Sequence, residues 1–226
     1  MITLPMPPDA MLGDWEMPLF QRAPEMEDFL RTHWIDGATF PNASFAHLQD
    51  ASVGVGWTNV HAPTPGAADG RRTVGLAEIF QPRPAKRWIM ERQRWAMHQI
   101  FGLEIPDFVI WFDAGHWAAD TVSIATKLGV ATHELLHCGQ ALDEYGAPKY
   151  ARSGQRKGQP VWSLVPHDVE QFNLVVEWFG AEAAGVIPMA RALAAGATMR
   201  QLLREAFGAE IGEPEPFLCG TCARAA

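Results

Sequence analysis

Apolar residues alternate with polar ones in parts of this chain, and that period predicts β-strands. Val53, Val55 and Trp57 fall on one side of such an alternation. Two further stretches are rich in β-branched and aromatic residues. The predicted strands are 52–60, 73–80 and 107–113. Residues 62–72 hold two prolines and two glycines, which predicts either a long hairpin-type connection between the first two strands or an exposed flap.

Apolar residues spaced three and four positions apart predict several helices. The predicted helices are Pro24–Trp34, 85–99, Asp120–Cys138, 167–179 and 188–207. In the third of these, Asp120 is the expected N-cap, and Val122 and Leu128 belong to a buried stripe. Between the third and fourth helices we expect a basic loop at Gly146–Pro160 and an extended segment at Val161–Val165.

Length and composition favour one globular α+β domain. The chain has 226 residues, of which 48% are apolar, and nine tryptophans, which is enough to form a single core. We expect an N-terminal arm at 1–24, a folded domain at 25–208 and a C-terminal tail at 209–226. The expected architecture is a small twisted sheet packed against the helix predicted at Asp120–Cys138, with further helices around it.

Charge and targeting signals restrict the possible partners. The net charge of −8 argues against a nucleic-acid partner, because such proteins usually present a basic surface. No stretch approaches the roughly 18–20 uncharged apolar residues that a membrane helix needs, so no membrane partner is expected. Residues 1–20 lack the basic start of a secretory signal, and three cysteines cannot form a disulfide framework. The expected compartment is the cytoplasm.

The pentapeptide His133-Glu134-Leu135-Leu136-His137 is the most informative chemical motif in the chain. It has the pattern H-E-x-x-H, in which two histidines one helical turn apart direct their imidazoles to one metal ion. The motif falls in the last turns of a predicted helix that has its own buried stripe, which suits a Zn2+ site. Glu134 is the expected general base, because its carboxylate lies near enough to take a proton from a zinc-activated water.

A catalytic zinc site needs a third protein ligand and leaves one position for water. We favour His167 as the third ligand, since imidazole is a common zinc ligand, with Glu170, Asp143 and Glu144 as alternatives. Asp143 has the spacing of the third ligand in the metzincin motif, but the glycine that this motif requires is displaced by one position. Asp168 is expected to cap the following helix; the alternative is a hydrogen bond to a ligand histidine.

The remaining candidates carry weaker signals. The two tyrosines, Tyr145 and Tyr150, both follow the motif, but the sequence does not single out a donor for a developing oxyanion. Cys219-Gly220-Thr221-Cys222 is half of a zinc ribbon without a second pair, and it lacks the flanking strand and helix of a redox motif. We therefore expect incidental thiols in the tail, and a small buried residue at Cys138.

The order of these features is similar to that of a known family. A strand at Asp107–Ile110 is followed by Trp117, by the H-E-x-x-H helix, and by His167-Asp168-Val169-Glu170-Gln171-Phe172 at the start of the next helix. Over Phe45–Gly180 this arrangement resembles the putative phage metallopeptidase family. The resemblance implies a zincin-like fold, a zinc peptidase activity, and the host cytoplasm as the compartment of a phage-encoded protein. It also implies metal ligands at His133, His137 and His167 and an acid/base role for Glu134.

These observations lead to one main functional expectation and three alternatives. We expect a zinc-dependent metallopeptidase that acts on a peptide or protein substrate, which pairs with an edge of the sheet. The alternatives are a non-catalytic, metal-stabilised phage or prophage protein on the same scaffold, a SprT-like protease, and a chance motif in a metal-free domain. SprT-like proteases often add a four-cysteine ribbon, which this chain lacks. The oligomeric state does not follow from the sequence.

Overall fold

The computed structural model describes residues 2–13, 16–60, 73–79, 87–102, 104–154, 156–166, 191, 205–206 and 218–219. The chain divides into two compact units, one of Leu4–Val165 with Glu213–Ala226 and the other of Met1–Thr3 with Pro166–Gly212. Within the second unit, the backbone N–H of Ile2 donates a hydrogen bond to the carbonyl of Ala206 over 3.2 Å. All elements described below belong to the first unit.

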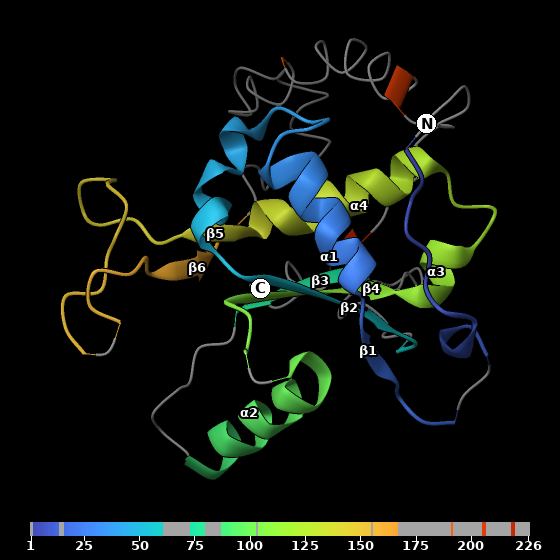
Figure 1. Ribbon diagram of the computed structural model, residues 1–226, viewed down its shortest axis with the longest axis horizontal. Helices are drawn as coiled ribbons and strands as arrows, with labels where there is room; N and C mark the ends of the chain where they lie inside the picture. The colour runs from blue at the N-terminus through green and yellow to red at the C-terminus, as the bar shows by residue number, and fades with distance from the viewer. Residues whose placement is uncertain are drawn as a thin grey trace, which may run out of the picture. The chain divides into compact units, whose positions relative to one another are not determined.

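A five-stranded mixed sheet forms the centre of the first unit (Figure 1). Its strands in spatial order are β1 (Phe20–Arg22), β2 (Val53–Thr58), β4 (Phe108–Asp113), β3 (Thr73–Ile79) and β7 (Leu218–Cys219). β2 pairs with β4, and β7 with β3, in parallel. β1 pairs with β2, and β3 with β4, in the antiparallel direction. Because β4 separates β2 from β3, the hairpin, one of the two alternatives predicted for residues 62–72, is wrong. The connecting residues 61–72 lie outside the described residues.

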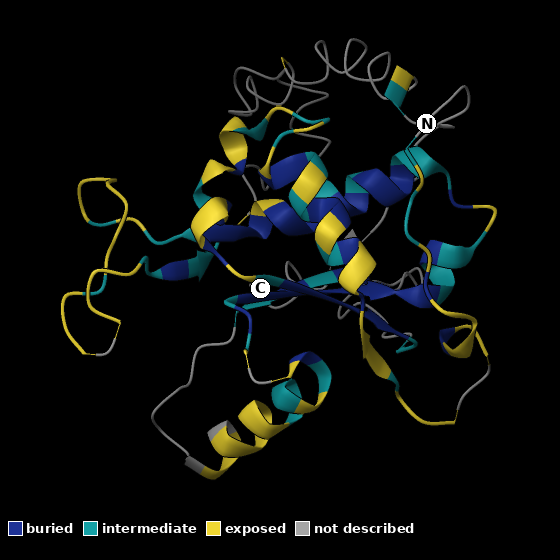
Figure 2. Ribbon diagram, viewed as in Figure 1, coloured by how far each residue is buried: buried dark blue, intermediate teal, exposed yellow. Residues whose placement is uncertain are grey.

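Helices lie on both faces of this sheet (Figure 1). α1 (Pro24–Leu30) and α4 (Ile124–His137) cover one face. α2 (Arg87–Phe101) lies on the opposite face. Successive side chains of β4 point to opposite faces, so that Trp111 packs with Phe101 of α2 while Phe112 packs with Trp117. Figure 2 shows that α4 and the central strands are largely buried, whereas α2 is largely exposed.

Several predicted helix boundaries differ from the observed ones. The first helix begins at Pro24 as predicted, but from Arg31 it continues as a wider π-helical turn through Ile35 (η2). The N-cap of α4 is Ser123, whose Oγ accepts a hydrogen bond from the backbone N–H of Thr126 over 3.1 Å. Asp120 lies too early to cap this helix, because a turn at 119–122 precedes it. Among the described helices, none is both long and apolar enough to cross a membrane.

The end of α4 continues directly into a second, two-stranded sheet. β5 (Cys138–Gln140) pairs antiparallel with β6 (Trp162–Leu164), and β6 lies within the extended segment predicted at Val161–Val165. The intervening loop folds back on itself, with a bridge between Tyr150 and Pro160. The pairing of β5 with β6 brings Val165 beside the last residue of α4. The predicted helices at 167–179 and 188–207 lie outside the described residues, apart from Arg191, Glu205 and Ala206.

Candidate metal centre

The two histidines of the motif converge at the C-terminal end of α4. His133 is half-buried and His137 is buried, and their imidazole rings lie with centroids 4.8 Å apart and planes at 75°. The Nε2 atoms of the two rings are 3.1 Å apart. Two nitrogen ligands at about 2.0–2.1 Å from a tetrahedral Zn2+ would be separated by about 3.3 Å. The observed pair therefore fits two of the positions that a zinc ion requires.

The tautomer of the His137 ring is set by the hydrogen bond at its Nδ1 atom. The Nδ1 atom of His137 lies 2.6 Å from the carbonyl oxygen of Val165, which can only accept a hydrogen bond. Nδ1 therefore carries the proton, and in the neutral ring the lone pair is on Nε2, the atom that faces His133. A metal-binding histidine commonly has its second ring nitrogen hydrogen-bonded to a carbonyl in this way.

The glutamate of the motif lies between α4 and the sheet. Glu134 is 0% exposed, and its side chain packs against Gly75 of β3. A Cβ atom at residue 75 would lie 2.7 Å from Oε1 and 2.9 Å from Cγ of Glu134, closer than packed atoms tolerate. Glycine at this position therefore provides the space that the Glu134 carboxylate occupies. Nothing in the sequence pattern distinguished Gly75 from the other glycines.

Cys138, which directly follows the motif, is completely buried. Its thiol is buried, and burial raises its pKa well above the ordinary value, with a further contribution from the negative charge of Glu134. The thiolate, which is the metal-binding form, is therefore disfavoured. This agrees with the prediction of a small buried residue at position 138.

The described residues do not complete a metal site. Within them, no group of three or more histidine, cysteine, aspartate or glutamate side chains could hold an ion. Asp143 instead holds a turn, because its Oδ1 accepts hydrogen bonds from the backbone N–H groups of Tyr145 and Ala147, both over 2.9 Å. These two bonds lower the pKa of the Asp143 carboxyl. Asp143 and Glu144 thus do not join the two histidines.

Most of the other predicted partners of this site lie outside the described residues. The favoured third ligand, its main alternative and the neighbouring acid all lie outside the described residues: His167, Glu170 and Asp168. Tyr145 and Tyr150, the two tyrosines considered as oxyanion donors, are both exposed. Of the C-x-x-C pair, Cys219 lies in β7 and Cys222 lies outside the described residues.

Two contacts that support the motif helix did not follow from the sequence. The indole Nε1–H of Trp34 donates a hydrogen bond to Oγ1 of Thr132 over 2.9 Å, and that hydroxyl donates to the carbonyl of Leu128 over 2.8 Å. The Nε2–H of His47 donates to the carbonyl of Cys138 over 2.8 Å. Both contacts join residues more than 90 positions apart, so no local pattern could indicate them.

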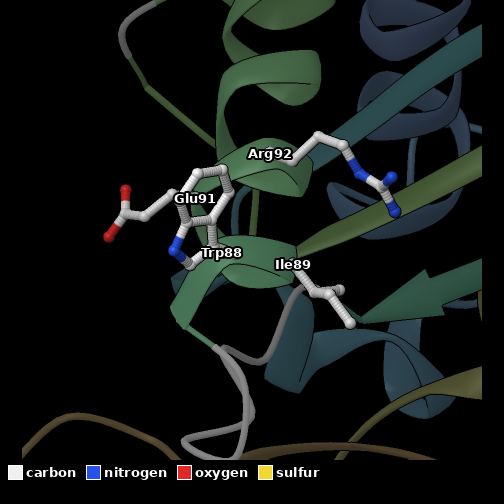
Figure 3. A pocket seen from close by; sticks show the side chains of 4 residues that line it. All are labelled: Trp88, Ile89, Glu91 and Arg92. Carbon is white, nitrogen blue, oxygen red and sulfur yellow. The ribbon is translucent and has the colours of Figure 1, made fainter.

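A separate cavity lies at the N-terminal half of α2, on the face of the sheet opposite α4. It has a volume of about 720 Å³, and the described residues that line it are Trp88, Ile89, Glu91 and Arg92 (Figure 3). In Figure 3, Trp88 and Glu91 extend to one side of the helix and Ile89 and Arg92 to the other. The Trp88 side chain is highly exposed. None of these residues is part of the H-E-x-x-H motif.

A mixed sheet packed against a helix that ends in H-E-x-x-H defines an α+β protein of the zincin-like class. The chain belongs to the family described as putative phage metallopeptidase, whose sequence model matches residues 20–201. That description places the family among metal-dependent hydrolases. Neither a curated protein nor a solved structure matches the chain.

Proposed function

We propose that this protein is a zinc-dependent peptidase whose metal ion is held by His133, His137 and His167. The observation that carries the proposal is the convergence of the first two Nε2 atoms at 3.1 Å. The hydrogen bond between His137 and Val165 supports it, because it leaves the Nε2 lone pair available. His167 stands two residues after Val165 in the sequence.

In the proposed reaction, Glu134 moves the proton. A bound zinc ion supplies Lewis-acid chemistry that lowers the pKa of a water molecule toward about 7. The Glu134 carboxylate takes a proton from the attacking water and returns it to the nitrogen of the leaving amine. Its complete burial and its contact with Gly75 hold the carboxylate in one place, so little reorganisation is needed during the proton transfers.

The proposed substrate is an extended peptide that pairs with β3. Gly75 of β3 lies against Glu134, so a peptide paired along the edge of β3 that β7 covers in this structure would run past the proposed general base. Backbone pairing provides affinity without demanding particular side chains. A peptide or protein segment in an extended conformation is therefore the substrate class that this arrangement favours.

The test separates metal binding from catalysis. In Glu134→Gln, zinc should remain near one equivalent by metal analysis, whereas hydrolysis of a diverse peptide mixture, followed by mass spectrometry, should fall about 100- to 10,000-fold. In His167→Ala, the zinc content itself should fall. Glu144→Gln is the matched control, because it removes an exposed carboxylate from the loop beyond the motif. Full hydrolysis by Glu134→Gln, or a parent protein that binds no zinc, would contradict the proposal.

A further inference from the structure

The C-terminal segment of the chain supplies a strand beside the proposed general base. β7 is parallel to β3, with Leu218 opposite Thr73 and Cys219 opposite Gly75. Gly75 is the same residue whose missing side chain leaves room for Glu134. β7 therefore pairs with β3 at the position along the sheet where Glu134 packs.

We propose that this C-terminal segment is a built-in competitor of the substrate for the outer edge of β3. The inference rests on the proposed function, in which an extended peptide reaches Glu134 by pairing along that edge. A given stretch of strand edge has one row of backbone N–H and C=O groups, so it pairs with one strand at a time. Occupation of Thr73–Gly75 by β7 therefore excludes a peptide from the same positions.

The described part of the pairing is irregular. Among the described residues it comprises the pairs Thr73–Leu218 and Gly75–Cys219, and the register shifts between them. A covalent tether nevertheless gives such a segment an effective concentration on the order of millimolar. The segment thus favours the state in which β7 covers the edge of β3, and a good substrate displaces β7.

Proline substitutions test this occupation in the zinc-loaded, full-length protein. Consecutive backbone N–H groups of a strand point to opposite sides, so only one of Leu218→Pro and Cys219→Pro removes a donor that faces β3. The other variant is the matched control at the neighbouring position. In the variant that loses a donor facing β3, amide hydrogen exchange in residues 73–79 should become faster. The specificity constant kcat/KM should rise about three- to tenfold through a lower KM, as expected if the closed state holds about 70–90% of the population.

A synthetic peptide provides a second measurement. The peptide Glu-Pro-Glu-Pro-Phe-Leu-Ser-Gly-Thr-Ser reproduces residues 213–222, with serine in place of both cysteines. It should slow exchange in residues 73–79 of the more open proline variant and inhibit its peptide hydrolysis competitively. A control peptide with proline at the two positions equivalent to Leu218 and Cys219 should do neither. Circular dichroism identifies a variant that no longer folds, and in that case the peptide measurement on the parent protein decides.

The possible outcomes separate this inference from the proposed function. Hydrolysis that is present but unchanged in both proline variants, together with unchanged exchange in residues 73–79, overturns the inference and leaves the peptidase proposal intact. If the parent and all variants cleave no peptide, the peptidase proposal fails. The exchange data and the binding of the synthetic peptide then still decide whether the C-terminal segment occupies the edge.

Discussion

His137 and Val165 exchange two hydrogen bonds: Nδ1–H of His137 donates to the carbonyl of Val165 over 2.6 Å, and the N–H of Val165 donates to the carbonyl of His137 over 2.8 Å. The last residue of the motif helix is thereby fixed to the chain segment that precedes the predicted third ligand. The side-chain bond also sets the tautomer that metal binding requires.

Gly139→Ala should weaken metal binding by disturbing Val165. A Cβ atom at residue 139 would lie 2.2 Å from Cγ2 of Val165, so Val165 must move and its hydrogen bonds with His137 must change. Loss of such a supporting contact typically lowers metal affinity about 10- to 100-fold. Competition with a chromophoric zinc chelator measures this affinity.

The matched experiment is a double-mutant cycle with Val165→Ala, which removes the colliding methyl group but keeps the carbonyl. The double variant Gly139→Ala/Val165→Ala should recover most of the lost affinity. Ser163 lies opposite Gly139 in the β5–β6 pair, and Ser163→Ala should leave the zinc affinity close to that of the parent. Equal affinity in Gly139→Ala and the parent would show that Val165 does not position His137.

Gly75→Ala should reduce turnover without removing the metal. The new methyl group would meet the Glu134 carboxylate at 2.7 Å and displace it, and a displacement of about 1 Å in a catalytic group can lower the rate about 100-fold. We expect kcat to fall while zinc content and KM change little. Gly54→Ala is the control, because its methyl group would collide with Phe101 and Pro106, away from Glu134, and should lower stability rather than kcat. A fall in zinc content in Gly75→Ala would contradict the assigned role.

Thr132→Val should destabilise the fold through the hydrogen bond that it removes. The valine variant leaves the buried indole N–H of Trp34 without its acceptor, at a cost of about 1–3 kcal/mol. In a Trp34→Phe background that donor is absent, so the same threonine substitution should cost clearly less. Denaturant unfolding of the four metal-free proteins gives both values. Equal costs in the two backgrounds would exclude this hydrogen bond as an important support of α4.

Acidification should destabilise the protein partly through His33. Burial lowers the pKa of His33 in the folded state, where Nδ1 lies 2.8 Å from Oγ1 of Thr39. Below the unfolded pKa of about 6.5, the unfolded chain therefore binds a proton more readily than the folded one, and the free energy of unfolding decreases. Above that pH both states are neutral and the effect vanishes. His33→Gln should lose less stability than the parent between pH 7.5 and 5.5; equal losses would disprove the assignment.

The elements that the sequence predicted well are those whose burial depends on local periodicity. All six residues of β4 are buried, and the continuous apolar run at 107–113 already indicated such a strand. The hairpin alternative for β2 and β3 was wrong because strand order depends on contacts between distant segments. β4 follows both strands in the chain but inserts between them. The N-cap of α4 was misplaced because a turn before Ser123 competes with Asp120 for the helix start.

The sequence by itself determined the H-E-x-x-H helix, the family and the expectation that His133 and His137 share one side of a helix, because these depend on a spacing of four residues. Only the tertiary structure decided that Gly75 leaves room for Glu134, that Val165 orients His137, and that β7 pairs at the level of the proposed general base. Each of these contacts joins segments that are far apart in the chain. Their geometry results from the packing of a helix on a sheet and from strand register, which a local pattern of residues does not encode.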